Sequence, residues 1–162
     1  MDKDAQRAFS VRGVTTGGVI AALYAALTLL FAFISLGEVQ FRLSEALTLL
    51  PVITPHAVPG LFLGCLMSNL LLGAPWQDVV FGSLATLLAA VLTRWFRRNL
   101  WLAAAMPVAV NGLVIGAMLH AVYNLPTLPA MLTVALGEAA VCFLLGVPLT
   151  RLVEKRLAGT IG

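Results

Sequence analysis

Long apolar runs, separated by short polar stretches, make up most of this chain. The first run covers residues 14–36 and is followed by a polar stretch at 37–45, and later runs cover 79–96, 100–122 and 127–153. A helix needs ~20 mostly apolar residues to cross the hydrocarbon core of a bilayer, and these runs are close to that length. The pattern therefore predicts a bundle of transmembrane helices with almost no soluble part.

The stretch 46–72 is also apolar, but it carries three prolines, at Pro51, Pro55 and Pro59. Proline has no backbone N–H to donate, and it disfavours helix at the residue before it. The stretch is therefore either one long helix or two short helices joined by a turn near Pro55.

The positions of the basic residues favour two short helices. Lys and Arg collect in cytoplasmic loops, and a turn near Pro55 places all the basic clusters on one side of the membrane. These clusters are Lys3, Arg7 and Arg12; Arg94, Arg97 and Arg98; and Arg151, Lys155 and Arg156. We expect an all-α membrane protein with one domain, six transmembrane helices and both termini in the cytoplasm, with approximate spans 14–36, 43–54, 56–72, 78–96, 100–122 and 127–153.

Composition supports the membrane assignment and excludes several classes of protein. Hydrophobic residues make up 60% of the 162 positions and charged residues only 10%, whereas soluble domains carry ~25% charged residues. The net charge of +3 is gathered in the loops, so nucleic acid is not an expected partner. The two cysteines, Cys65 and Cys142, lie in apolar runs, so we expect them to be small buried hydrophobic residues. No metal-ligand spacing, phosphate-binding loop or nucleophile triad is present in the sequence, so we expect no catalytic residue, metal or cofactor.

This topology places polar and aromatic side chains from three hairpins at the external face. They are Arg42, Glu45, Asn69, Trp76, Asp78, His120, Tyr123 and Asn124. A ligand site at this face is one interpretation. The alternatives are that Arg42 pairs with Glu45, that Asp78 is favoured at its helix N-terminus by the dipole, and that Trp76 anchors the interface.

Two polar residues lie deep in predicted helices, Asn111 in the fifth and Glu138 in the sixth. A carboxylate at that depth costs roughly 2.5–3.5 kcal/mol on insertion scales, so it is expected to face a cavity or a partner. The alternatives are a protonated Glu138 bonded to a neighbouring helix, and an Asn111 that only joins two helices. His120 lies nine residues after Asn111, about half a turn away around the helix, so a shared cavity requires a bent helix.

The first helix carries two ridges of small residues, at Gly17, Ala21 and Ala25 and at Gly18, Ala22 and Ala26. Small residues spaced by four lie on one face and let helices approach closely in lipid. Packing within the bundle explains single pairs, such as Gly112 with Gly116 and Ala135 with Ala139. Two ridges side by side also form a smooth face that suits a partner protein.

Three segments of the chain resemble the QueT family. They are VQFRLSEALTLLP at residues 39–51, PGLFLGCLMSNL at 59–70 and DVVFGSLATLLAA at 78–90. These proteins look like substrate-binding S components of energy-coupling factor (ECF) transporters in bacterial cell membranes. The resemblance implies a six-helix S-component bundle with a site near the external side, and partners comprising a transmembrane coupling protein and two ATPases. It implies docking through Ala21 and Ala25 or through Ala22 and Ala26, and a queuosine precursor as cargo, a 7-deazaguanine such as preQ1 or preQ0.

The chemistry of that cargo suits the candidate residues. The adjacent N–H donors of a guanine-like edge match a carboxylate, either Glu138 or Glu45. Asn111 or Asn69 is placed to donate to the ring carbonyl, and the cationic aminomethyl group of preQ1 matches a second acid, Glu45 or Asp78. Tyr123 and Trp76 offer aromatic surfaces.

Three other functions remain open at the level of sequence. An S component for another vitamin or nucleobase would carry a similar set of residues, and only a panel of ligands separates it. A small membrane enzyme would need acids or a nucleophile at the cytoplasmic face, where this chain has mainly basic residues and His56. A structural subunit would leave Glu138 without a ligand.

Overall fold

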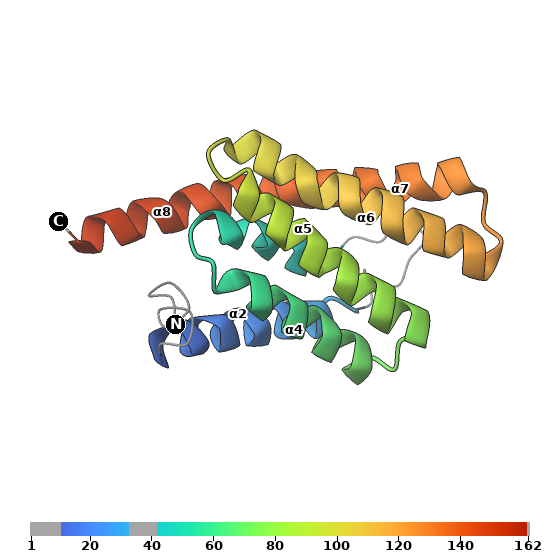
Figure 1. Ribbon diagram of the computed structural model, residues 1–162, viewed down its shortest axis with the longest axis horizontal. Coiled ribbons are helices and arrows are strands. Elements are labelled where there is room, and N and C mark those ends of the chain that lie inside the picture. Colours follow the sequence, from blue (N-terminus) through green and yellow to red (C-terminus); the bar gives the residue numbers. More distant parts are fainter. Residues whose placement is uncertain (1–10, 33–41, 162) are drawn as a thin grey trace, which may run out of the picture.

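In a computed structural model of the chain, residues 11–32 and 42–161 are described, and within them all regular structure is helical. The six helices of this part of the chain, two of which change character along their length, are shown in Figure 1. They are α2 (Val11–Leu30); the 3-10 helix η1 (Leu43–Val52); α4 (Ala57–Leu71); the π-helical turn η2 (Asp78–Gly82) running into α5 (Ser83–Trp95); α6 (Leu100–Tyr123); and α7 (Thr127–Val141) running through the π-helical turn η3 (Cys142–Gly146) into α8 (Val147–Ile161).

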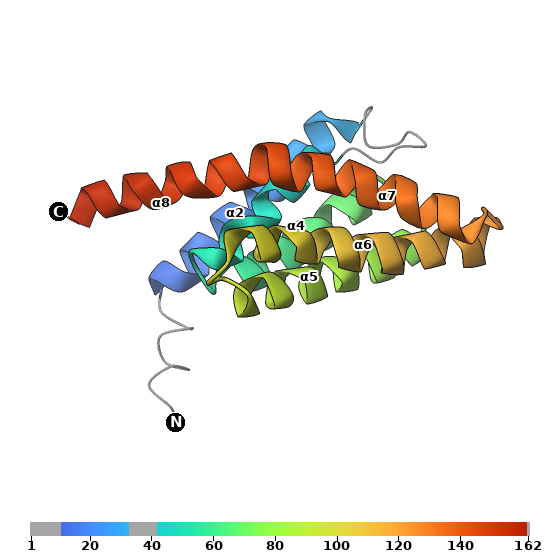
Figure 2. The ribbon, with the colours of Figure 1, turned by 90° about the horizontal axis from the view of Figure 1, so that it is seen from above.

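Four of these helices are long and apolar enough to cross a membrane: Val11–Leu30, Asp78–Trp95, Leu100–Tyr123 and Thr127–Leu157. Figure 2 shows that α7 and α8 form one continuous helix. Large apolar side chains point outward along these helices, as lipid contact requires. The predicted class, an all-α membrane protein with six helices, is therefore confirmed for the described residues.

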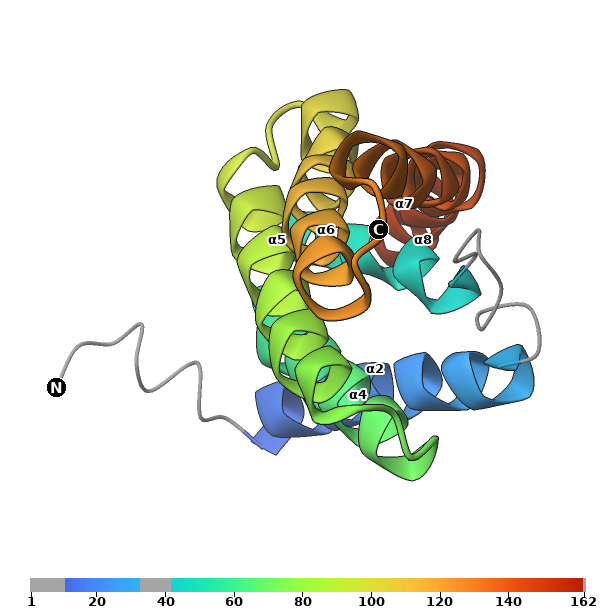
Figure 3. The same cartoon turned by 90° about the vertical axis from the view of Figure 1, so that its right-hand side faces the viewer.

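The helix η1 is short, and it is enclosed by the others. Seen along the bundle, it lies between α2, α5 and the α7–α8 helix (Figure 3). Ten residues of 3-10 helix are about 20 Å long, which is less than the ~30 Å of a hydrocarbon core. The proline-rich stretch thus forms two short helices, and η1 fills the bundle interior.

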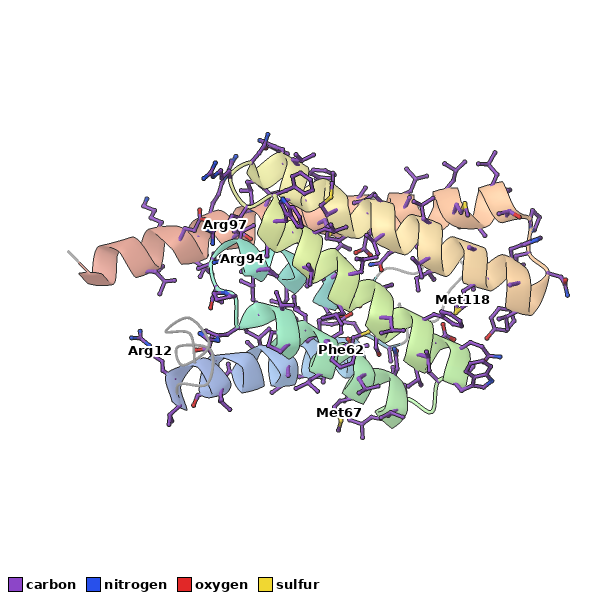
Figure 4. All side chains as sticks on the ribbon, in the orientation of Figure 1. Arg12, Phe62, Met67, Arg94, Arg97 and Met118 are labelled. Atoms are coloured by element: carbon purple, nitrogen blue, oxygen red, sulfur yellow. The ribbon has the colours of Figure 1, made fainter. Side chains whose placement is uncertain are left out.

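The arginines of the basic clusters lie together at one end of the bundle. Arg12, Arg94 and Arg97 are at the end where α2 begins and α8 ends (Figure 4), while Lys3 and Arg7 lie outside the described residues. Arg94 Nη1 donates to the carbonyl oxygens of Pro51 at 3.0 Å and Val52 at 3.1 Å. These are carbonyls at the end of η1, so Arg94 caps η1 and ties it to α5. That the basic end faces the cytoplasm stays a prediction.

Glycines allow the closest helix contacts. A Cβ on Gly60 of α4 would lie 2.6 Å from the carbonyl oxygen of Gly17 on α2. A Cβ on Gly116 of α6 would lie 2.6 Å from the Cα of Met131 on α7. Backbones therefore touch across both pairs, as expected for small residues at helix interfaces in lipid.

Replacing Gly60 by alanine is expected to lower the thermal unfolding midpoint by several degrees, because the new methyl group meets backbone that cannot move aside. Overpacking of this kind costs about 1–3 kcal/mol. The matched control is Gly18→Ala on α2, where a Cβ meets nothing within 4 Å. Thermal unfolding of both proteins in one detergent checks the prediction, and equal midpoints for the two variants would contradict it.

Candidate functional site

A small cavity lies in the interior of the bundle, lined by four separate parts of the chain. Its lining residues are Arg42 and Glu45 at the start of η1, Gly82 and Thr86 on η2 and α5, Asn111 and Ile115 on α6, and Val134 and Glu138 on α7. The far end of η1 is bonded to Arg94 at the basic end of the bundle. The cavity is therefore at the end of η1 that points away from the basic clusters.

Glu45 presents a carboxyl group to this cavity. Its side chain is only 2% exposed, and its Oε1 accepts a hydrogen bond from the hydroxyl group of Tyr24 on α2. Its second oxygen, Oε2, is buried and accepts no hydrogen bond from a donor group of the described residues, and the carboxyl group of Glu138 lies within hydrogen-bonding reach of the Glu45 side chain. A buried polar atom without a partner is costly and is common where a ligand binds.

Glu138 is the second acid, and its side chain is 5% exposed. Asn111 Nδ2 donates to its Oε1 at 2.9 Å, which joins α6 to α7. The Sγ of Cys142, one turn further along the same helix, lies 3.8 Å from the same oxygen and 3.8 Å from the backbone oxygen of Glu45. The two deep polar residues of the sequence thus form one pair at the wall of the cavity.

Arg42 provides the positive charge of the site. Its Nη2 donates to Asn69 Oδ1 at 3.3 Å, and its buried Nε has no hydrogen-bond partner in the described part of the chain. An arginine guanidinium stays charged even when it is buried, so Arg42 brings a fixed positive charge to the site.

Each of the two π-helical turns lies next to this cavity. Gly82, the last residue of η2, lines it, and a Cβ at Gly82 would lie 3.3 Å from Asn69 Nδ2. The turn η3 begins at Cys142, four residues after Glu138. Such turns inside α-helices frequently mark functional sites, and here they occur in two helices that face the same cavity.

Six of the ten candidate residues from the sequence fall in or beside this cluster. Arg42, Glu45, Asn111 and Glu138 line the cavity. Asn69 holds Arg42, and its Nδ2 donates to the backbone oxygen of Asp78 at 3.2 Å. Asp78 thus reaches the cluster through its backbone.

The other four candidates lie outside the cavity lining. Trp76 is 66% exposed, with its ring 6.5 Å from that of Phe81. His120 is exposed, with Nδ1 2.8 Å from the carbonyl oxygen of Leu125. Tyr123 is exposed, and Asn124 ends α6 in the left-handed conformation at φ 55°. A contribution of these four residues to ligand binding stays a prediction.

The structure adds side chains that the sequence did not single out. Tyr24 sits in an apolar run of α2, and Gly82 and Thr86 lie in the QueT-like segment 78–90, in which only Asp78 was proposed as a site residue. Ile115 and Val134 complete the lining as apolar side chains. The sequence signal that could have identified Tyr24 and Thr86 as site residues is a single polar residue within an apolar helix. This signal is weak, because such side chains often form hydrogen bonds within their own helix. Thr86 does so, since its hydroxyl group donates to the backbone oxygen of Gly82 at 2.9 Å.

The volume of the cavity is about 20 Å³. That is room for one water molecule, whereas pockets for small molecules measure about 300–1,000 Å³. Ligand binding in this cluster therefore requires movement of the lining side chains or helices.

An all-helical membrane protein with two acids, an amide and a guanidinium around an interior cavity has the features of a membrane transport protein that binds a small polar solute. The sequence model of the family described as QueT transporter matches residues 14–155. The chain therefore belongs to the QueT transporter family, which indicates a role in transport and not in catalysis.

A curated relative carries the same name. The chain is similar to the "Queuosine precursor transporter QueT" of Lactococcus lactis subsp. cremoris (strain MG1363), with 37% identity over 76 residues. This match covers 46% of the chain and 44% of the relative, so the chain spans less than half the length of that protein. No solved structure gives a significant match to the chain.

Proposed function

We propose that this chain is the substrate-binding subunit of an ECF-type importer for a queuosine precursor, and that preQ1 is its preferred ligand. The name of the curated relative supports the substrate class. The observation that carries the proposal is the cluster of Glu45, Glu138 and Arg42 around one cavity. Two carboxyl groups against one guanidinium carry a formal charge of −1 when both acids are ionised, which complements a cation.

The two acids have distinct roles in this proposal. Glu138, held by Asn111, accepts the adjacent N–H donors of the guanine-like edge, and Asn111 also lies beside the ring carbonyl. Glu45 presents its unpaired Oε2 to the cationic aminomethyl group. Arg42 lies directly before the first residue of η1, and its guanidinium covers the bound base.

The partners in this proposal are the ECF coupling protein and two ATPases, and α2 is the docking helix. Figure 1 shows α2 at the edge of the bundle with α4 on one side. Ala21 is partly buried, and its backbone lies against Gly64 of α4, where a Cβ would be 2.8 Å from the Ala21 oxygen. Ala22 and Ala26 are exposed. We therefore assign docking to the ridge of Ala22 and Ala26, and not to Ala21 and Ala25.

A groove at the start of the same ridge supports this assignment. Its volume is about 410 Å³, and its lining includes Val14 and Gly18 of α2 and Pro59 and Leu63 of α4. Val14, Gly18, Ala22 and Ala26 are each four residues apart, so they share one face of α2. The groove thus extends the smooth face on which a helix of the coupling protein would lie, in a bacterial cell membrane with the basic end in the cytoplasm.

A ligand panel on the purified protein tests the proposal. Calorimetric titration with preQ1, preQ0, guanine and an unrelated vitamin is expected to give the tightest binding for preQ1 and weaker binding for the neutral preQ0. Binding of the vitamin alone would indicate an S component for another cargo. Failure of every deazapurine to bind would refute the proposed substrate.

A further inference from the structure

Tyr24 is a buried polar side chain whose partner is a carboxyl group of the cavity. It lies on α2 and is completely buried, with a relative exposure of 0%. Its hydroxyl group donates to Glu45 Oε1. A hydroxyl group in such surroundings is costly to bury without a partner, so the bond to Glu45 satisfies Tyr24 and links α2 to the ligand site.

The bond places the two oxygens of Glu45 in different surroundings. Oε1 is held by Tyr24, whereas Oε2 is buried without a donor group among the described residues, and the carboxyl group of Glu138 is the other acid within reach of Glu45. A carboxyl group held at one oxygen has the direction of its other oxygen fixed, and Glu45 lines the cavity. We propose that Tyr24 is a positioning residue that orients Glu45 so that Oε2 faces the ligand; this inference rests on the proposed function of the cavity.

Packing holds Tyr24 in the required place. A Cβ on Gly64 of α4 would lie 2.8 Å from the Cβ of Tyr24, so only glycine leaves room for the tyrosine at this crossing. One turn further along α2, Thr28 Oγ1 lies 2.8 Å from Ser44 Oγ, the residue before Glu45. The start of η1 is therefore attached to α2 at two points, and only the bond from Tyr24 reaches a carboxyl group.

These two bonds provide a matched pair of variants. Tyr24→Phe and Thr28→Val each remove one buried hydroxyl group from the same helix, but only Tyr24→Phe releases Glu45. We expect Tyr24→Phe to weaken preQ1 binding about tenfold, which corresponds to 1.4 kcal/mol, and Thr28→Val to change the dissociation constant by less than about threefold. In a Glu45→Ala background no carboxyl group is left to orient, so adding Tyr24→Phe should cost less than twofold in affinity.

A second measurement needs no ligand. With ¹³C in the glutamate carboxyl groups, the four glutamates of the chain give separate NMR signals, and Glu45→Gln assigns the signal of Glu45. Tyr24→Phe is expected to shift that signal, and Thr28→Val is expected to leave it in place.

Several outcomes would overturn the assignment of Tyr24. They are unchanged preQ1 affinity in Tyr24→Phe, an equal loss in Thr28→Val, or a Glu45 signal that Tyr24→Phe does not move. If the unaltered protein binds no deazapurine, it is the proposed function that fails, and the Glu45 signal then decides the role of Tyr24 independently.

Discussion

Glu138→Gln is expected to weaken preQ1 binding at least about 100-fold, a loss of about 2.7 kcal/mol. In the proposed function, Glu138 accepts hydrogen bonds from two N–H donors of the base. Glutamine replaces one of the two acceptor oxygens with an NH₂ donor, which would face an N–H donor of the base and leave it without an acceptor. Removing one partner from a buried, charge-assisted contact costs about 2–5 kcal/mol. The fold should be retained, because a glutamine Oε1 still accepts the hydrogen bond from Asn111.

The same substitution at Glu154 is the matched control, because Glu154 is exposed on α8. Titration of preQ1 into both variants, with thermal unfolding measured alongside, checks the result. Unchanged affinity in Glu138→Gln would mean that Glu138 acts as a neutral hydrogen-bonding group between α6 and α7, and it would remove Glu138 from the binding site.

Ala22→Trp is expected to abolish ATP-driven uptake and to leave the preQ1 dissociation constant of the isolated chain within about twofold. The exposed ridge of Ala22 and Ala26 is smooth because both side chains are single methyl groups, and an indole ring would hold a partner helix away from the backbone of α2. Ala22 is exposed and does not line the cavity, so the free subunit should fold normally.

Two other tryptophan variants separate docking from general damage. Leu132→Trp adds the same ring to a side chain of α7 that is 53% exposed, and uptake should continue. Ala21→Trp should instead destabilise the isolated chain, because Ala21 lies against Gly64. Uptake of labelled preQ1 by cells, together with recovery of the ATPases on the tagged subunit, measures each effect. Full uptake with Ala22→Trp would remove this face as the docking site.

The amino-acid pattern by itself determined the class of protein and the number of helices. The composition and the run lengths require lipid contact, and the basic clusters together with the prolines favour two short helices over one in the stretch 46–72. The packing of small residues within the bundle was also predicted, and Gly112 does lie at a close helix contact, where a Cβ would be 3.0 Å from the methyl group of Ala135. These features follow from the types of residue and their spacing along the sequence, so they could be predicted without the tertiary structure.

Only the tertiary structure decided which polar residues meet. Asn111 and Glu138 are 27 positions apart, and Tyr24 and Glu45 are 21 apart, so each contact depends on how two helices cross. The half-turn between Asn111 and His120 was visible in the sequence, but the structure alone shows Asn111 at the cavity and His120 bonded to the loop at Leu125. The proposed choice between the two alanine ridges likewise rests on α4, because α4 packs against Ala21 while Ala22 and Ala26 are exposed.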